Sequence, residues 1–264
     1  MMEIREIRPA DRPTLVELWH SVFGDPVSYV EEFFRILPDI GSGVVAVENG
    51  VPVGAAYMIT GLELCEGGKT RRCGYLYAVA VDPAARGRGT GGALSQAAAA
   101  LGRARGAELI CTLPAEPGLY AWYERLLGVR CALCRERRDM DSRPGPIPQP
   151  IGAAEYLRRR EALLAGRPHL RLSEAAMRLE EANCRAFGGF LCALGDGLAA
   201  AYVDGDAVQV RELLGAPPEA AAAVGAALGT ARVRLWLPAE RGEPYLAFAP
   251  ADLPAATVWN LAFD

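Results

Sequence analysis

A proline-rich stretch near the middle of the chain most constrains how the chain can fold. Between Ser142 and Pro150 the sequence reads SRPGPIPQP, with four prolines in nine residues. Proline has no backbone N–H donor and favours an extended polyproline conformation, so this stretch does not continue a helix or a sheet interior. The residues on either side are each close in number to an ordinary domain. We therefore expect two domains, at residues 1–141 and 153–264, joined by a linker at 142–152.

The first half shows a mixed order of helices and strands. Apolar residues at helical spacing predict helices, and short apolar runs that end at turn signals predict strands. Asn49-Gly50 is a strong hairpin signal between the first two strands. Helices are expected at 14–23, 28–37, 91–105 and 118–127, and strands at 44–47, 51–64, 74–81, 107–113 and 129–137.

The second half repeats nearly the same order, with two helices, a meander of three strands, a helix and further strands. Helices are expected at 153–165, 173–187 and 217–228, and strands at 190–194, 198–204, 207–214, 232–237, 245–248 and 257–263. We therefore expect an α/β (α+β) fold, with a mixed, mostly antiparallel sheet flanked by helices, in two tandem copies.

The segment that carries chemistry is a glycine-rich junction between a strand and a helix. The strand ends at Asp82-Pro83, and glycines follow at 87, 89, 91 and 92 before the helix begins. Successive glycines let backbone amides converge on an anion, and a helix N-terminus adds unpaired N–H groups. Arg86 and Arg88 flank the loop, where they could reach phosphate oxygens. The junction therefore predicts a pyrophosphate site.

Three phosphate-binding motifs compete for this junction. A Walker loop needs a Gly-Lys-Ser/Thr ending, and the only lysine, Lys69, lies elsewhere. The dinucleotide motif G-x-G-x-x-G occurs literally at 87–92, but alone it is weak evidence. The run Arg86-x-x-Gly89-x-Gly91 follows a strand that ends in AVAVDP. It resembles the Arg/Gln-x-x-Gly-x-Gly/Ala signature of the GNAT superfamily, the Gcn5-related N-acetyltransferases, which bind acetyl-coenzyme A.

The resemblance covers residues 3–140 in element order, and residues 118–129, GLYAWYERLLGV, are similar to the family's Phe-Tyr-Glu-Lys-Leu-Gly-Phe ending with one residue inserted. It implies the acyl-coenzyme-A N-acyltransferase fold, with a V-shaped cleft between the strands at 75–82 and 107–113. In this family the pantetheine arm pairs with the first of these strands. The implied coenzyme-binding residues are Tyr77, Ala78, Val79, Ala80, Val81, Arg86, Gly87, Arg88, Gly89, Thr90 and Gly91.

The resemblance also implies the reaction. A neutral primary amine, on a small molecule or a peptide, attacks the thioester of acetyl-coenzyme A in a ternary complex, and an acid protonates the departing thiolate. Family members commonly use a tyrosine for this step, which by alignment is Tyr123. Tyr120 competes, because the segment Glu116 to Tyr120 is similar to the mycobacterial enhanced-intracellular-survival acetyltransferases.

The general base departs from the family pattern. Many members carry a glutamate on the strand of Tyr75 and Tyr77, and no acidic residue occurs from Gly74 to Val81. The remaining candidates are Glu116, Glu63, a water chain through Tyr75 and Tyr77, His20, and the terminal carboxylate of Asp264. The missing glutamate keeps a non-catalytic acyl-coenzyme-A-binding or sensing module as the alternative function.

The second half lacks the glycine junction. At the equivalent place it reads ELLGAPPE, from Glu212 to Glu219, and an acid near the helix N-terminus would repel pyrophosphate. We expect a degenerate copy of the first domain, in a tandem layout that resembles mycothiol synthase and the enhanced-intracellular-survival proteins.

Composition excludes several other classes. The formal charge of −4 and the pI near 5.4 argue against nucleic-acid binding, including RNA binding through Arg86 to Gly89. With only His20 and His169, we expect no metal site. The charged N-terminus and the short apolar runs predict neither a signal peptide nor a membrane span. Seven cysteines, most of them in apolar runs, indicate a reducing, cytoplasmic location. The oligomeric state is left open.

Overall fold

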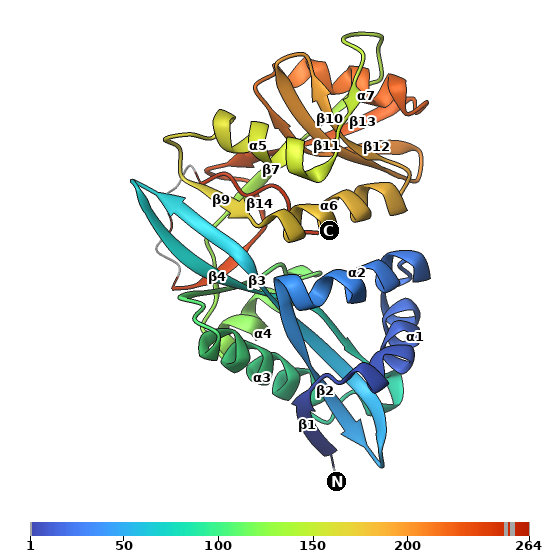
Figure 1. Cartoon of the computed structure of the whole chain (residues 1–264), viewed down its shortest axis with the longest axis vertical. Helices are drawn as coiled ribbons and strands as arrows, with labels where there is room; N and C mark the ends of the chain where they lie inside the picture. The colour runs from blue at the N-terminus through green and yellow to red at the C-terminus, as the bar shows by residue number, and fades with distance from the viewer. Residues whose placement is uncertain (1, 251–252, 254–256, 264) are drawn as a thin grey trace. The chain divides into compact units, whose positions relative to one another are not determined.

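The computed structural model describes residues 2–250, 253 and 257–263 and divides into two compact units (Figure 1). The described part of the first unit contains residues 2–64, 70–132, 245–250 and 253, and that of the second contains 65–69, 133–244 and 257–263. The chain therefore changes unit after Ala132, ahead of the proline-rich stretch, and it returns to the first unit at Tyr245. Asp264, one of the candidate bases, lies outside the described residues.

The first unit is a mixed sheet with helices on both faces. Its strands follow the order β1-β2-β3-β4-β5-β15-β6, in which β4 and β5 run parallel and β15 runs antiparallel to both of its neighbours. The elements are β1 (Met2–Glu6), α1 (Arg12–Phe23), α2 (Val27–Ile40), β2 (Gly41–Glu48), β3 (Val51–Glu66), β4 (Lys69–Val81), α3 (Thr90–Ala104), β5 (Leu109–Thr112), α4 (Pro117–Leu127), β6 (Arg130–Cys131) and β15 (Ala247–Ala249).

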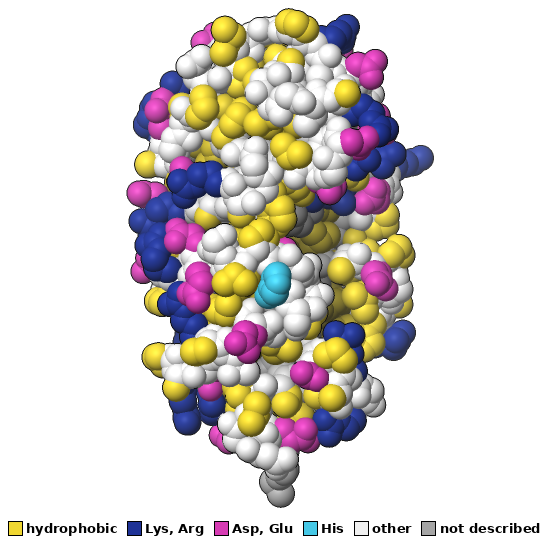
Figure 2. All heavy atoms as spheres, turned by 90° about the vertical axis from the view of Figure 1, so that its right-hand side faces the viewer, with side chains coloured by type: hydrophobic (Ala, Val, Ile, Leu, Met, Phe, Trp, Pro, Cys, Tyr) yellow, Lys and Arg dark blue, Asp and Glu magenta, His cyan; other side chains and the backbone are white. Residues whose placement is uncertain are grey.

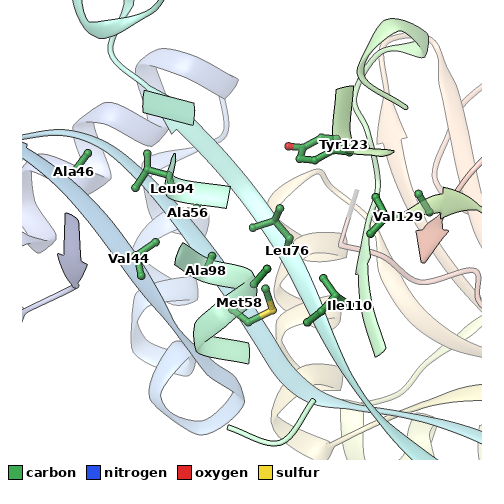
Figure 3. Packing of buried hydrophobic residues seen from close by; sticks show 12 residues of the cluster. Val44, Ala46, Ala56, Met58, Leu76, Leu94, Ala98, Ile110, Tyr123 and Val129 are labelled. Atoms are coloured by element: carbon green, nitrogen blue, oxygen red, sulfur yellow. The ribbon is translucent and has the colours of Figure 1, made fainter. Parts of the chain in front are cut away.

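Alternation along the central strands assigns each pair of helices to one face. Leu76 of β4 packs with Leu94 of α3 and Tyr123 of α4 in one buried cluster (Figure 3). The next residue, Tyr77, instead has its ring 5.6 Å from that of Trp19 in α1. Successive side chains of a strand point to opposite faces. Helices α3 and α4 therefore cover one face and α1 and α2 the other, as Figure 1 also shows.

The second unit contains a sheet in the order β14-β7-β13-β12-β11-β10-β8. Buried valines of β12 and β13 pack against helix α7 in its core. The elements are β7 (Cys134–Asp141), β8 (Gln149–Pro150), α5 (Ala153–Leu163), β9 (His169–Leu172), α6 (Glu174–Ala186), β10 (Phe190–Leu194), β11 (Gly197–Asp204), β12 (Ala207–Leu214), α7 (Ala221–Ala227), β13 (Arg232–Ala239) and β14 (Glu243–Pro244).

Most expected elements form, and the exceptions have physical causes. The strand expected at 129–137 is broken into β6 and β7, because β7 pairs with β13 along its whole length, from Cys134 to Asp141. The strand expected at 257–263 is wrong, since this segment contributes only an isolated bridge between Val258 and His169. Helix α7 is shorter than expected because two prolines precede it and a 3₁₀ turn occupies its first residues. Strand β1 was not expected.

A buried ion pair lies inside the second unit, between α5 and β12. Arg160 Nε donates to both oxygens of Glu212, at 3.1 and 3.0 Å, and both side chains are fully buried. Tyr156 donates to the same carboxylate at 3.0 Å, and Arg160 Nη1 donates to Leu170 O at 2.7 Å. Burial alone would lower the pKa of the Arg160 guanidinium, but the attraction of Glu212 raises it. The Arg160 guanidinium therefore stays charged in the interior.

Removing the cation of this pair should destabilise the protein more than removing both charges. Arg160→Met leaves the Glu212 carboxylate buried without a cation, which is expected to cost about 3–5 kcal/mol of unfolding free energy. The double variant Arg160→Met/Glu212→Gln removes the stranded charge and keeps an acceptor for Tyr156, so it should recover part of that loss. Urea unfolding followed by circular dichroism measures both. A double variant no more stable than Arg160→Met contradicts the electrostatic explanation.

Candidate active site

The site is built where β4 and β5 part. The two strands pair from Cys73 opposite Leu109 to Leu76 opposite Thr112, and the pairing ends there although β4 continues to Val81. Thr112 Oγ1 donates to Leu76 O at 3.1 Å, at the last pair. Beyond it, the β5-facing edge of β4 no longer has a strand partner in β5. The residues from Tyr77 to Val81 thus form the edge that the sequence predicts for the pantetheine arm.

A kink at Ala78 changes which side chains of β4 face which helices. Ala78 has φ of 46°, in the left-handed region that residues other than glycine rarely adopt. Before it Leu76 faces α3 and α4, and after it Val79 and Val81 pack against the same cluster, so the alternation shifts by one residue. An extra residue of this kind is the signature of a β-bulge. Tyr77 is thereby left facing α1 and α2, directly beside the parting.

The glycine junction presents the first turn of α3. Gly87 and Gly89 have φ of 75° and 80°, and a Cβ on either would meet nothing within 4 Å. The first helical hydrogen bond runs from Ala93 N to Gly89 O, so the amides of Thr90, Gly91 and Gly92 precede the helix's own ladder. Open space, glycine backbone and a positive helix end together fit an anion such as a pyrophosphate.

Side chains around the junction hold the loop in shape. Arg88 makes two hydrogen bonds to Glu48, at 3.0 and 3.1 Å, and Arg86 Nε donates to Val81 O at 3.0 Å. Thr90 Oγ1 donates to Ala85 O at 3.1 Å. The two arginines are thus engaged with the protein itself, and their contact with phosphate stays a prediction.

The two candidate tyrosines of α4 lie in different surroundings. Tyr123 is buried in the cluster of Figure 3, and burial raises the pKa of its hydroxyl, although a hydrogen bond with Ser95 opposes the shift. Tyr120, one turn nearer the start of the helix, is half-buried, and its hydroxyl donates to Tyr245 O at 2.7 Å. The helical spacing puts both on the side of α4 that meets the cluster, but only Tyr120 remains partly accessible to solvent.

On the opposite face of the sheet, aromatic rings surround Tyr77. The rings of Trp19, Phe33 and Tyr75 lie 5.6 to 5.8 Å from that of Tyr77. The Tyr77 hydroxyl lies 3.0 Å from that of Tyr29 in α2. Trp19 Nε1 donates to Asp25 Oδ2 at 2.7 Å, in the connection between α1 and α2.

The base candidates named from the sequence are scattered. Glu116 is exposed at the N-cap of α4 and makes no side-chain cap bond. Glu63 is half-buried on β3, and His20 is exposed, with Nδ1 2.8 Å from Asp25 O. Tyr75 and Tyr77 do lie together, with ring centroids 5.7 Å apart. Of these candidates, the tyrosines are the ones on β4 itself, at the parting.

Sequence reasoning missed two residues beside the site. Tyr29, on α2, supplies the hydroxyl that meets Tyr77, and its place in a helical apolar stripe gave no sign of this. Trp122 lies against the first turn of α3, since a Cβ on Gly92 would be 3.7 Å from its Cζ2 atom. The spacing of α4 could have indicated Trp122, because it sits between the two tyrosines already singled out.

The surface carries charges of both signs. On the face shown in Figure 2, basic and acidic side chains are interspersed, and hydrophobic side chains lie between them. No helix within the described residues is long and apolar enough to cross a membrane. In the same residues, no three His, Cys, Asp or Glu side chains gather as a metal site would require.

Comparison with known proteins finds a family match in the first half of the chain. Residues 3–124 match the acetyltransferase (GNAT) domain family. None of the curated proteins compared with the chain matches its sequence.

Solved structures match nearly the whole chain. A GCN5-related N-acetyltransferase from Kribbella flavida is 20% identical with a TM-score of 0.66, and the match covers 95% of this chain and 73% of that one. A probable N-acyltransferase of unknown function from Enterococcus faecalis is 11% identical with a TM-score of 0.69, covering 94% and 72%. Eis1 from Mycobacterium abscessus is 18% identical with a TM-score of 0.57, covering 93% and 73%. At these identities the likeness concerns the fold, and it spans both halves.

Substitution of Gly89 tests the junction as an anion site. Gly89→Glu places a carboxylate beside the amides of α3, so coenzyme A binding should weaken by about 100-fold or more, as two or three charge-assisted hydrogen bonds are lost. Gly89→Ala brings only the strain of its left-handed backbone and should weaken binding less. Isothermal titration calorimetry measures both. Gly205→Glu, at an open left-handed turn of the second unit, is the control. Binding by Gly89→Glu equal to that of Gly205→Glu would rule the junction out.

Proposed function

Residues 3–124 of this chain form an acetyltransferase domain of the GNAT family, and we propose that the chain uses it to move an acetyl group from acetyl-coenzyme A to a primary amine. On this proposal the chain is an acyltransferase, and acetyl-coenzyme A is its co-substrate. The observation that carries the proposal is that the edge of β4 without a partner in β5, from Tyr77 to Val81, is followed directly by the glycine junction.

The coenzyme would be held by the backbone. Its pyrophosphate would accept hydrogen bonds from the amides of residues 87–91, and its pantetheine arm would pair with β4 from Tyr77 to Val81. A backbone N–H of this edge would stabilise the oxyanion that forms when the amine attacks the thioester carbonyl. This arrangement needs no side chain of β4, which agrees with the apolar sequence Ala78-Val79-Ala80-Val81.

We assign the acid to Tyr120. Its hydroxyl is half-buried and donates its proton to Tyr245 O at 2.7 Å, so a proton on this group can be redirected to the departing sulfur. When the C–S bond breaks, the electron pair goes to sulfur, which takes the proton from Tyr120. The proton that the nitrogen loses restores the phenol through solvent. We assign Tyr123 to packing, because its hydroxyl is buried and bonded to Ser95.

The second unit would have no acetyl-transfer site of its own. Its strand-to-helix junction carries Pro217 and Pro218, which lack N–H donors, and Glu219 in the following turn. We therefore propose a catalytic domain and a degenerate copy of it. Most of the seven cysteines lie in apolar runs of the sequence, which supports a reducing, cytoplasmic setting for the reaction.

Release of free thiol from acetyl-coenzyme A tests the function and the acid together. Incubation with a pool of primary amines should release thiol, and Tyr120→Phe should lower kcat by about 100-fold while coenzyme binding is kept. Tyr123→Phe, which removes the neighbouring hydroxyl of the same helix, should keep most of the activity. Coenzyme binding without thiol release for any amine would support a sensing module. Loss of activity in Tyr123→Phe alone would reverse the assignment.

A further inference from the structure

We infer that the paired hydroxyls of Tyr77 and Tyr29 hold the acceptor amine against the thioester by accepting a hydrogen bond from its N–H. The inference rests on the proposed function, because it needs a thioester at the parting of β4 and β5. It adds the group that positions the amine, which is the second substrate. The sequence of β4 offers no carboxylate for this role.

The two faces of the sheet separate the two substrates. The amides of the junction belong to α3, which covers one face together with α4, so the coenzyme reaches the parting from that side. Tyr77 is the first residue of β4 beyond the last pair with β5, and its ring faces α1 and α2. An amine that approaches from the side opposite the coenzyme therefore meets Tyr77 first.

The Tyr77 hydroxyl is held in a fixed position. Rings of α1, α2 and β4 surround the Tyr77 ring, and the Tyr29 hydroxyl lies 3.0 Å from its own. The bulge at Ala78 fixes the direction of Tyr77, because the alternation of β4 changes at the next residue. A phenolic oxygen has two lone pairs, so a hydroxyl of this pair can accept from an amine while it is bonded to the other.

The pair acts as a neutral acceptor and takes up no proton. Burial raises the pKa of Tyr77 well above its ordinary value, and the facing groups Tyr29 of α2, Tyr75 of β4 and Asp25 between α1 and α2 raise it further. A raised pKa keeps the phenol protonated through the physiological range. It can orient an amine whose lone pair points at the carbonyl carbon, but it cannot deprotonate an ammonium ion. The amine must therefore arrive neutral.

The protons of the acetyl transfer balance without a general base on the protein. The nitrogen–carbon bond forms as the carbon–sulfur bond breaks, sulfur receives a proton from Tyr120, and the proton from nitrogen returns to Tyr120 through water. Tyr77 and Tyr29 begin and end the cycle in the same protonation state. They are thus positioning residues that contact the amine.

Removing one hydroxyl should separate amine binding from coenzyme binding. With ethylamine as acceptor, Tyr77→Phe should lower kcat/KM for the amine by about 3- to 10-fold, as for one neutral hydrogen bond, and leave KM for acetyl-coenzyme A unchanged. Tyr29→Phe should have a smaller effect in the same direction. Tyr57→Phe is the matched control, a buried tyrosine of the same aromatic cluster on β3. Equal rates for Tyr77→Phe and Tyr57→Phe would overturn the inference.

The pH profile tests whether the hydroxyl pair acts without taking up a proton from the amine. Ethylamine and the less basic 2,2,2-trifluoroethylamine are similar in size, and the acid limb of kcat/KM should have its midpoint at the pKa of each amine. Tyr77→Phe should keep both midpoints. One midpoint common to both amines would mean that a group on the protein takes the proton, and the inference would fall.

These outcomes are distinct from failure of the proposed function. If no amine of any size releases thiol, the acetyl-transfer proposal fails. If larger amines are acetylated and ethylamine is not, the function stands and the inference fails, because the hydroxyl pair recognises only the N–H group that all primary amines share.

Discussion

The parting of β4 from β5 is the constraint on which the rest of the site depends. Strand β5 ends at Thr112, so β4 continues to Val81 without a partner in β5, and unpaired backbone groups are costly to bury. Here the pairing ends at Leu76, and the left-handed Ala78 turns the strand. One strand then serves two faces: Val79 and Val81 continue the apolar surface toward α3, while Tyr77 belongs to the aromatic cluster of α1 and α2.

The second unit also has a parallel pair of strands whose pairing stops before the strands end, with different residues at that point. Its parallel pairing ends at Val210 opposite Leu235, although β13 continues to Ala239, and the register of β12 shifts beside Ala200. The place that Ala78 takes in the first unit corresponds to Glu212, which the ion pair with Arg160 neutralises in the interior. Backbone geometry is thus common to both units, and the local residues decide whether a substrate could enter.

The sequence predicts local features of the fold well and partner strands poorly. Asn49-Gly50 forms the expected turn, with φ of 52° and 81°, because this turn needs a positive φ at both positions and asparagine and glycine adopt it readily. The junction at Gly87 and Gly89 follows for the same reason. The pairing of β7 with β13 and the position of β15 between β5 and β6 depend on segments about a hundred residues apart. The spacing of apolar residues within one segment does not encode which distant strand that segment pairs with.

The distinction between Tyr120 and Tyr123 shows the same limit at the site itself. Three residues apart on one helix, they share a face, and spacing alone cannot rank them. The structure separates them by depth and by partner, because Tyr120 bonds to Tyr245, which belongs to the segment that contributes β15. The first unit is therefore incomplete without residues that follow the whole second sheet in the sequence. The two units are thus linked covalently at two places in the chain, and β15, which follows the second sheet in the sequence, completes the sheet of the first unit.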